Sequence, residues 1–148
     1  MLVMNNIGPA PVGVIVNRPT RIAVARLFPD VERLAPLEDK VYFGGPVDVT
    51  KVSFLFRADA THEHAIQVVD GVYFSADREL LRNLLDRERP MEGLRIFIGH
   101  SAWGQGQLEA EIARNDWTLA TATPETIFSG KPARPWPERE PPDGARRI

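Results

Sequence analysis

Residues 94–117, LRIFIGHSAWGQGQLEAEIARNDW, constrain the fold more than any other stretch of the chain. The run Arg95–Ile98 is rich in β-branched and aromatic residues and too short for a helix, so it predicts a buried strand. Three glycines come next: Gly99, Gly104 and Gly106. Glycine takes positive φ without steric cost, as a sharp strand-to-helix turn requires. From about Gln107 the apolar spacing becomes helical, so backbone N–H groups should converge at a helix start, where an anion or polar ligand could bind.

Other apolar runs bounded by turn residues predict further strands. These strands are residues 2–4, 12–16, 41–43 and 52–56, a hairpin of 66–69 with 72–74 around Asp70-Gly71, and a weak strand over 118–121. Three segments have helical signals. The first is residues 21–28, which Thr20 would cap, and the last is a short helix from Thr123-Pro124 to Phe128. The clearest helix lies between them: it is capped by Ser75 or Asp77 and runs to about Glu88. Its apolar face consists of Leu80, Leu81, Leu84 and Leu85. Residues 29–40 are expected to be irregular. Because strands and helices do not strictly alternate, the pattern indicates an α+β or mixed-sheet α/β fold.

The length of 148 residues fits a single domain, which we place at residues 1–130. Residues 131–148 hold five prolines and few large apolar side chains, so we expect an extended tail. The chain has no cysteine, which removes disulfides, Cys-ligated zinc and thiol chemistry. No apolar run approaches membrane-spanning length, and the N-terminus lacks the pattern of a signal peptide. We therefore expect a cytoplasmic protein without a membrane partner.

Three motifs occur in order along the chain. They are Gly13-x-x-x-Asn17-Arg18-Pro19, YFGGPV at 42–47, and GHSAWGQGQLEAE at 99–111 with Trp117 closing the segment. Together they resemble the AlgH/YqgE family of bacterial proteins over roughly residues 12–136. The resemblance implies one compact α+β domain with a mixed, barrel-like sheet and flanking helices. It also implies a protein that is usually labelled a transcriptional regulator or left uncharacterised.

The chain departs from the family pattern in two places. Members usually carry a further N-terminal segment before the strand at residues 2–4, so we expect an uncovered sheet edge here. Their turn usually reads Gly-Trp-Gly, whereas Ala102 precedes Trp103 in this chain. That alanine indicates either that the position accepts a Cβ or that the turn is slightly re-formed.

Ligand-binding candidates gather where three turns are expected to meet, at Asn17-Arg18-Pro19, Gly44-Gly45-Pro46 and Gly99–Gln107. The residues we assign to this turn cluster are Asn17, Arg18, Gly44, Gly45, Ser101, Trp103, Gly104, Gly106 and Gln107. The competing interpretation is structural, since Asn and Gly allow unusual φ values, Pro fixes a chain exit and a buried Arg18 could tie the loops together.

No catalytic residue is assigned. Gly99-His100-Ser101 is close to a nucleophile elbow, but Trp103 replaces the second glycine and no histidine follows the serine. The reverse order, with His62 or His64 as base, stays open. The same loop lacks the lysine of a P-loop and the third glycine of a dinucleotide fingerprint.

No metal or cofactor is assigned either. His62-Glu63-His64 could offer two imidazoles but needs further ligands, which only His100 or a carboxylate could supply. Glu109 and Glu111 stand two apart on a helix and point in different directions, so they do not form an acid–base pair.

Direct DNA binding is not expected, because the clearest helix balances its arginines with acids and the net charge is −2. The sequence thus favours a non-enzymatic regulatory or binding protein that acts through an unknown protein partner or small ligand. The alternative is an anion-binding or small-molecule-binding protein, or a hydrolase, with its site at the turn cluster.

Overall fold

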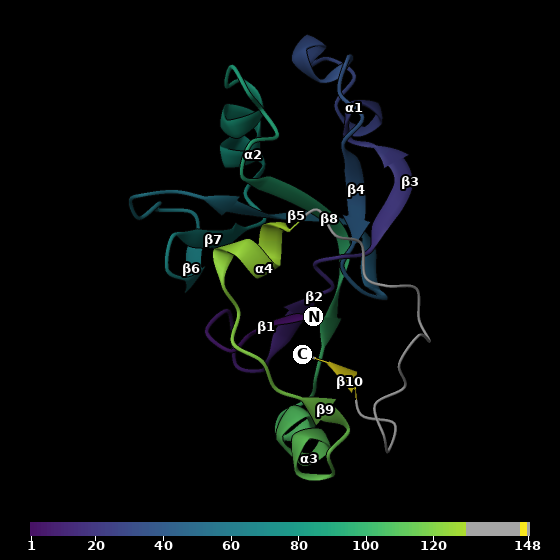
Figure 1. The fold of residues 1–148 in the computed structure, drawn as a ribbon, viewed down its shortest axis with the longest axis vertical. Coiled ribbons are helices and arrows are strands. Elements are labelled where there is room, and N and C mark those ends of the chain that lie inside the picture. The colour runs from purple at the N-terminus through teal and green to yellow at the C-terminus, as the bar shows by residue number, and fades with distance from the viewer. Residues whose placement is uncertain (130–145, 148) are drawn as a thin grey trace.

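The computed structural model describes residues 1–129 and 146–147, and Figure 1 shows their arrangement. The strands are β1 (Leu2–Met4), β2 (Val12–Val14), β3 (Pro19–Ala23), β4 (Lys40–Phe43), β5 (Val47–Arg57), β6 (Ile66–Val69), β7 (Val72–Ser75), β8 (Leu94–Ala102), β9 (Trp117–Thr118) and β10 (Arg146–Arg147). The helices are α1 (Val24–Leu27), a 3-10 turn at Glu32–Leu34, α2 (Arg78–Leu85), α3 (Gln107–Ala113) and α4 (Pro124–Phe128). Helices α1 and α2 lie at one end of the molecule, and α3 with β9 lies at the other.

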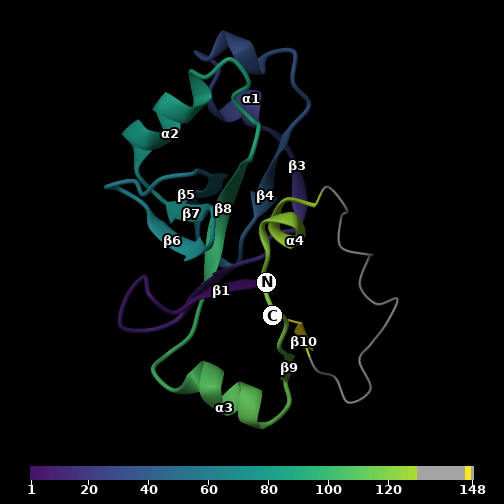
Figure 2. The ribbon, with the colours of Figure 1, turned by 60° about the vertical axis from the view of Figure 1, so that its left-hand side comes forward.

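Strand β8 is the centre of an eight-stranded mixed sheet whose main path is β1-β2-β8-β5-β7-β6. It pairs antiparallel with β2 and β5 and parallel with β4, and β4 also pairs antiparallel with β3. Figure 2 shows β8 running lengthwise between the helices at the two ends. This barrel-like mixed sheet with few helices confirms the predicted α+β class.

The hydrophobic core has two parts, one on each side of the sheet, because successive strand residues point to opposite faces. Ile96 of β8 and Phe56 of β5 belong to the part that α1 and α2 cover. Phe97 and Leu55, their neighbours on the same strands, belong to the part that β1, β2 and α4 cover. Both faces of β8 are therefore buried.

Several predicted elements are confirmed. Helix α2 begins after Asp77, whose side chain accepts a hydrogen bond from the Leu80 N–H at 2.7 Å, and it buries the predicted leucine face. The hairpin turns at Asp70-Gly71, the strand at residues 2–4 forms an edge of the sheet, and α4 begins with a capping box at Thr123 and Thr126.

The helix predicted over residues 21–28 is wrong for its first half. Residues 19–23 form β3, and only Val24–Leu27 is helical. The Thr20 hydroxyl does not cap a helix: it donates to the Val41 carbonyl at 2.7 Å and accepts from the Ile22 N–H at 3.0 Å. Pairing with β4 thus overrides a local helical preference.

Other corrections concern where elements end. Gly99 lies inside β8, which continues to Ala102, so the strand is longer than Arg95–Ile98 and the turn comes later. Strand β5 is likewise longer than residues 52–56. Helix α2 stops at Leu85, short of Glu88, where the Arg87 side chain donates to the Leu84 carbonyl.

Smaller shifts affect three other segments. Strand β2 ends at Val14 rather than at residue 16, and β9 covers Trp117–Thr118 instead of 118–121. A 3-10 turn interrupts the segment expected to be irregular. Of the predicted tail, the structure describes only Arg146–Arg147, whose backbone pairs with β9 as β10; the rest lies outside the described residues.

Candidate functional site

The structure brings the three predicted turns together through backbone hydrogen bonds. The Phe43 N–H donates to the Arg18 carbonyl at 2.8 Å, and the Gly44 N–H donates to the Ile98 carbonyl at 2.9 Å. The Ile15 N–H donates to the Gly44 carbonyl at 2.9 Å. The chain after β2, the β4–β5 turn and β8 therefore lie against one another.

Two glycines of the turn cluster, Gly44 and Gly45, allow this close approach. A Cβ on Gly44 would lie 2.3 Å from the Gly99 carbonyl oxygen, and one on Gly45 would lie 2.3 Å from the His100 carbonyl carbon. No space of side-chain size is left between these backbones, so both glycines are explained by packing.

Trp103 and Gln107 belong to a polar network that anchors α3. The Glu111 carboxylate accepts hydrogen bonds from the indole N–H groups of Trp117 at 2.6 Å and Trp103 at 3.1 Å, and from the Gln107 amide at 3.1 Å. Gln107 in turn accepts from the Gly104 N–H at 2.9 Å. These bonds, that of Trp117 foremost, hold the pKa of Glu111 below its usual value. Gly106, at the start of α3, has a φ of 75° and open space around it.

Ser101 has no histidine within reach in the described part of the chain. His100 is its neighbour on β8, so the two side chains point to opposite faces. The His62 ring packs edge-on against Phe56 at 5.1 Å, and Phe56 pairs with Leu94 at the start of β8. Ser101 lies seven residues further along that strand, which is about 23 Å at roughly 3.3 Å a residue. The Ser75 hydroxyl donates to the His64 carbonyl, and Ser75 pairs with Phe54, which pairs with Ile96, so His64 also lies toward the start of β8. Neither His62 nor His64 is therefore in place as the base of an elbow.

Arg18 and Asn17 differ in exposure. Arg18 is exposed, not buried as the structural interpretation supposed, and its guanidinium lies over the Phe43 ring at 4.9 Å. Within residues 1–129 it makes no ion pair. Asn17 is half-buried beside it. Arg18 is thus the one charged side chain of the turn cluster, and it faces solvent.

Sequence reasoning missed Arg95, which is 7% exposed. Its Nη1 donates to the Val16 carbonyl at 2.6 Å and to the Ile127 carbonyl of α4, and its guanidinium stacks on the Tyr42 ring at 4.3 Å. Burial lowers the pKa of Arg95. The available signal was a single cation in the otherwise apolar run LRIFI, at a strand position whose neighbours are buried.

Neither a cluster of metal ligands nor a helix able to cross a membrane occurs among residues 1–129 and 146–147. No three histidines, aspartates or glutamates of this part come together as metal ligands. None of its helices has the length and apolar character needed to cross a membrane.

Comparison with known proteins identifies the family of the chain. A model described as AlgH-like matches residues 1–139. A UPF0301 protein of Chlorobium limicola is 36% identical over 126 residues, which cover 84% of this chain and 65% of the relative. A UPF0301 protein of Chromobacterium violaceum is 34% identical over 122 residues, with 78% and 64% covered. The chain thus spans about 65% of the length of these curated relatives.

Two solved structures share the fold. The AlgH protein of Pseudomonas aeruginosa superposes with a TM-score of 0.63 at 24% identity, over 83% of this chain and 67% of that one. Protein DIP2367 of Corynebacterium diphtheriae gives a TM-score of 0.65 at 23% identity, over 88% and 69%. At such identities the likeness concerns the fold alone.

Proposed function

The chain belongs to the AlgH-like family, and we propose that it is a non-enzymatic regulatory or binding protein that acts in the cytoplasm through a ligand or a protein partner. The observation that carries this proposal is the separation of Ser101, near the end of β8, from His62, which packs against Phe56 beside the start of that strand. A hydroxyl becomes a nucleophile only when a base lies within hydrogen-bond reach. The lack of cysteine in the sequence fits a reducing compartment.

The hydrogen bonds made by the polar side chains of the turn cluster also support a binding role. Trp103 and Gln107 are engaged with Glu111, so they hold α3 in place and are not available to act on a substrate. The glycines serve close backbone packing. What the cluster offers at its surface is shape and the Arg18 charge, which suit recognition better than bond cleavage.

Regulation by direct DNA contact is not part of the proposal. Two arginines near α2 are committed to other groups: Arg82 pairs with Asp30, and Arg87 donates to the carbonyls of Leu84, Pro90 and Glu92. A protein that tracks phosphates needs cations that are free to replace counterions. The net charge of −2 gives no general attraction either.

A second candidate function is capture of a small ligand at the turn cluster itself. The observation that favours it is Arg18, an exposed cation stacked on Phe43 where three turns converge. Under this second hypothesis the Arg18 guanidinium attracts the ligand by its charge, and the backbone of the three turns forms the surface that the ligand contacts.

Hydrolysis assays on a panel of carboxylic and phosphoric esters test the main proposal. We expect no turnover by the wild-type protein above that of Ser101→Ala. Turnover that disappears in Ser101→Ala would overturn it. A thermal-shift screen against metabolites tests the second candidate, which predicts a stabilising ligand whose effect is lost in Arg18→Ala.

A further inference from the structure

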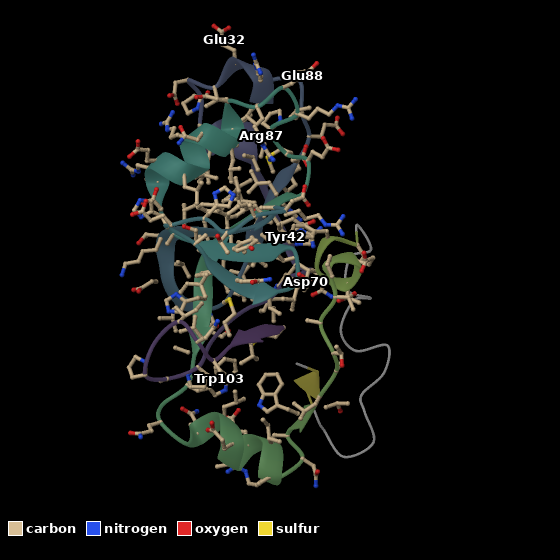
Figure 3. All side chains as sticks on the ribbon, turned by 90° about the vertical axis from the view of Figure 1, so that its left-hand side faces the viewer. Glu32, Tyr42, Asp70, Arg87, Glu88 and Trp103 are labelled. Carbon is tan, nitrogen blue, oxygen red and sulfur yellow. The ribbon has the colours of Figure 1, made fainter. Side chains whose placement is uncertain are left out.

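A pocket of about 410 Å³ opens beside α4, apart from the Gly44-Gly45-Pro46 and Gly99–Gln107 turns, and Pro19 of the first turn contributes to its lining. We call it the Arg95 pocket; its lining includes Glu38, Asp39, Lys40, Tyr42, Arg95 and Phe128. Figure 3 shows Tyr42 near the middle of the molecule, well apart from Trp103 along the long axis. The pocket therefore differs in place from the α3 network as well.

The Arg95 guanidinium is only partly satisfied by the protein. Both hydrogens of Nη1 are taken, one by each of the carbonyls of Val16 and Ile127. Within the described residues, Nε and Nη2 make no hydrogen bond, and no carboxylate pairs with Arg95. A buried cation without a counter-ion is costly, so an anion at this place would be stabilising.

Arg95 lines the pocket, and its unpaired edge is not fully buried. In the described part of the chain, no side-chain nitrogen or oxygen is both fully buried and without a hydrogen bond. Nε and Nη2 have no partner, so they must touch open space, and the Arg95 pocket is the space that this residue lines. The Nε–Nη2 edge carries two parallel N–H donors, which match the two oxygens of a carboxylate.

The surroundings of the guanidinium select among anions. The rings of Tyr42 and Phe128 lie 4.3 and 5.9 Å from the guanidinium carbon, which suits a ligand with an apolar or aromatic body. Glu38 and Asp39 stand on the rim with Lys40, so a ligand with several negative charges would meet two carboxylates.

We propose that the Arg95 pocket binds a small organic monoanion, a carboxylate with an aromatic or apolar group, held by the Nε–Nη2 edge of Arg95. This site rests on the proposed binding function and gives it a ligand class. The carbonyl bonds of Nη1 fix the guanidinium beforehand, so the side chain loses little freedom when the ligand enters.

Benzoate is the probe, titrated into the full chain while ¹H–¹⁵N spectra are recorded. We expect saturable shifts at residues 40–42, 91–95 and 127–128, with a dissociation constant of about 1 mM or below. ATP should bind more weakly because of the two rim carboxylates. Shifts centred on Arg18, or no saturable shifts at all, would overturn the site.

Variants separate ligand binding from the structural role of Arg95. Arg95→Lys keeps the positive charge but loses the two parallel N–H donors of the guanidinium, and we expect the affinity for benzoate to fall about tenfold. Arg82→Lys is the matched control, since it alters an arginine stacked on the Phe28 ring outside the pocket, and the benzoate affinity of this variant should stay unchanged.

A second variant covers the case in which Arg95→Lys does not fold. Glu38→Gln combined with Asp39→Asn alters two exposed side chains on the rim and should strengthen benzoate binding, more so at low salt. Unchanged affinity in this variant would contradict the proposal. Loss of this site would leave the hydrolysis result untouched, whereas turnover would overturn the proposed function whatever benzoate does.

Discussion

Replacing Gly99 by alanine should be among the most damaging single changes in the sheet. Its φ is 69°, and a Cβ there would lie 2.2 Å from the Gly45 carbonyl oxygen and 3.2 Å from that of Val47. The left-handed conformation alone costs an alanine roughly 1–2 kcal/mol. The Gly45 carbonyl is backbone and cannot swing aside as a side chain would, so the β4–β5 turn must move away from β8.

That movement sets the size of the effect. It would break the 2.9 Å hydrogen bond from the Gly44 N–H to the Ile98 carbonyl. A buried donor left without a partner costs about 1–3 kcal/mol. Together with the strain, we expect the free energy of unfolding to fall by roughly 2–5 kcal/mol.

Gly106→Ala is the matched control, because Gly106 has a φ of 75° but nothing within 4 Å of the added Cβ. It should cost only the strain, about 1–2 kcal/mol. The gain from a stiffer unfolded chain applies to both variants and cancels in the difference. Urea unfolding followed by circular dichroism measures both. Equal losses of unfolding free energy would refute the argument that contact with Gly45 decides the cost.

Three further predictions concern stability. Asp77→Ala removes the cap of α2 and should lower the free energy of unfolding by about 1 kcal/mol in urea titrations, while Asp77→Asn should retain most of it. Thr123→Ala should cost a similar amount, about 1 kcal/mol, because it dismantles the capping box of α4; an unchanged urea midpoint would show that the box does not stabilise the fold. The pKa of Glu111 is depressed in the folded protein, so its contribution should be present above its ordinary pKa of 4.5 and disappear as pH falls through the folded value. In Glu111→Gln the free energy of unfolding should therefore depend less on pH in this acidic range. The same pH dependence in the wild type and in Glu111→Gln would contradict a stabilising role of the Glu111 carboxylate.

Elements that depend on nearby residues could be read from the sequence. The leucines of the apolar face of α2 recur at helical spacing within eight residues, and the 66–74 hairpin closes over a two-residue turn. Each of these elements can therefore be predicted from its own residues. Strand β3 could not be read in this way. Its conformation is set by Thr20, whose hydroxyl bonds to Val41, a residue 21 positions away.

The same distinction applies to the candidate site. The meeting of the three turns was predicted, because glycine and proline mark strand ends locally. That Gly44 and Gly45 serve backbone contact became apparent only when β8 was placed against them. Arg95 was missed because its partners lie 79 and 32 positions away, and the lone cation in LRIFI does not indicate which groups surround it.

The central place of β8 also bears on how the chain is made. Strands β2, β4 and β5 all precede β8 in the sequence, yet each of them pairs with it. During synthesis these three strands leave the ribosome before their common partner exists, so their edges stay unpaired for a time. We would expect folding to complete only after residue 102 emerges, and such strand edges are what chaperones protect.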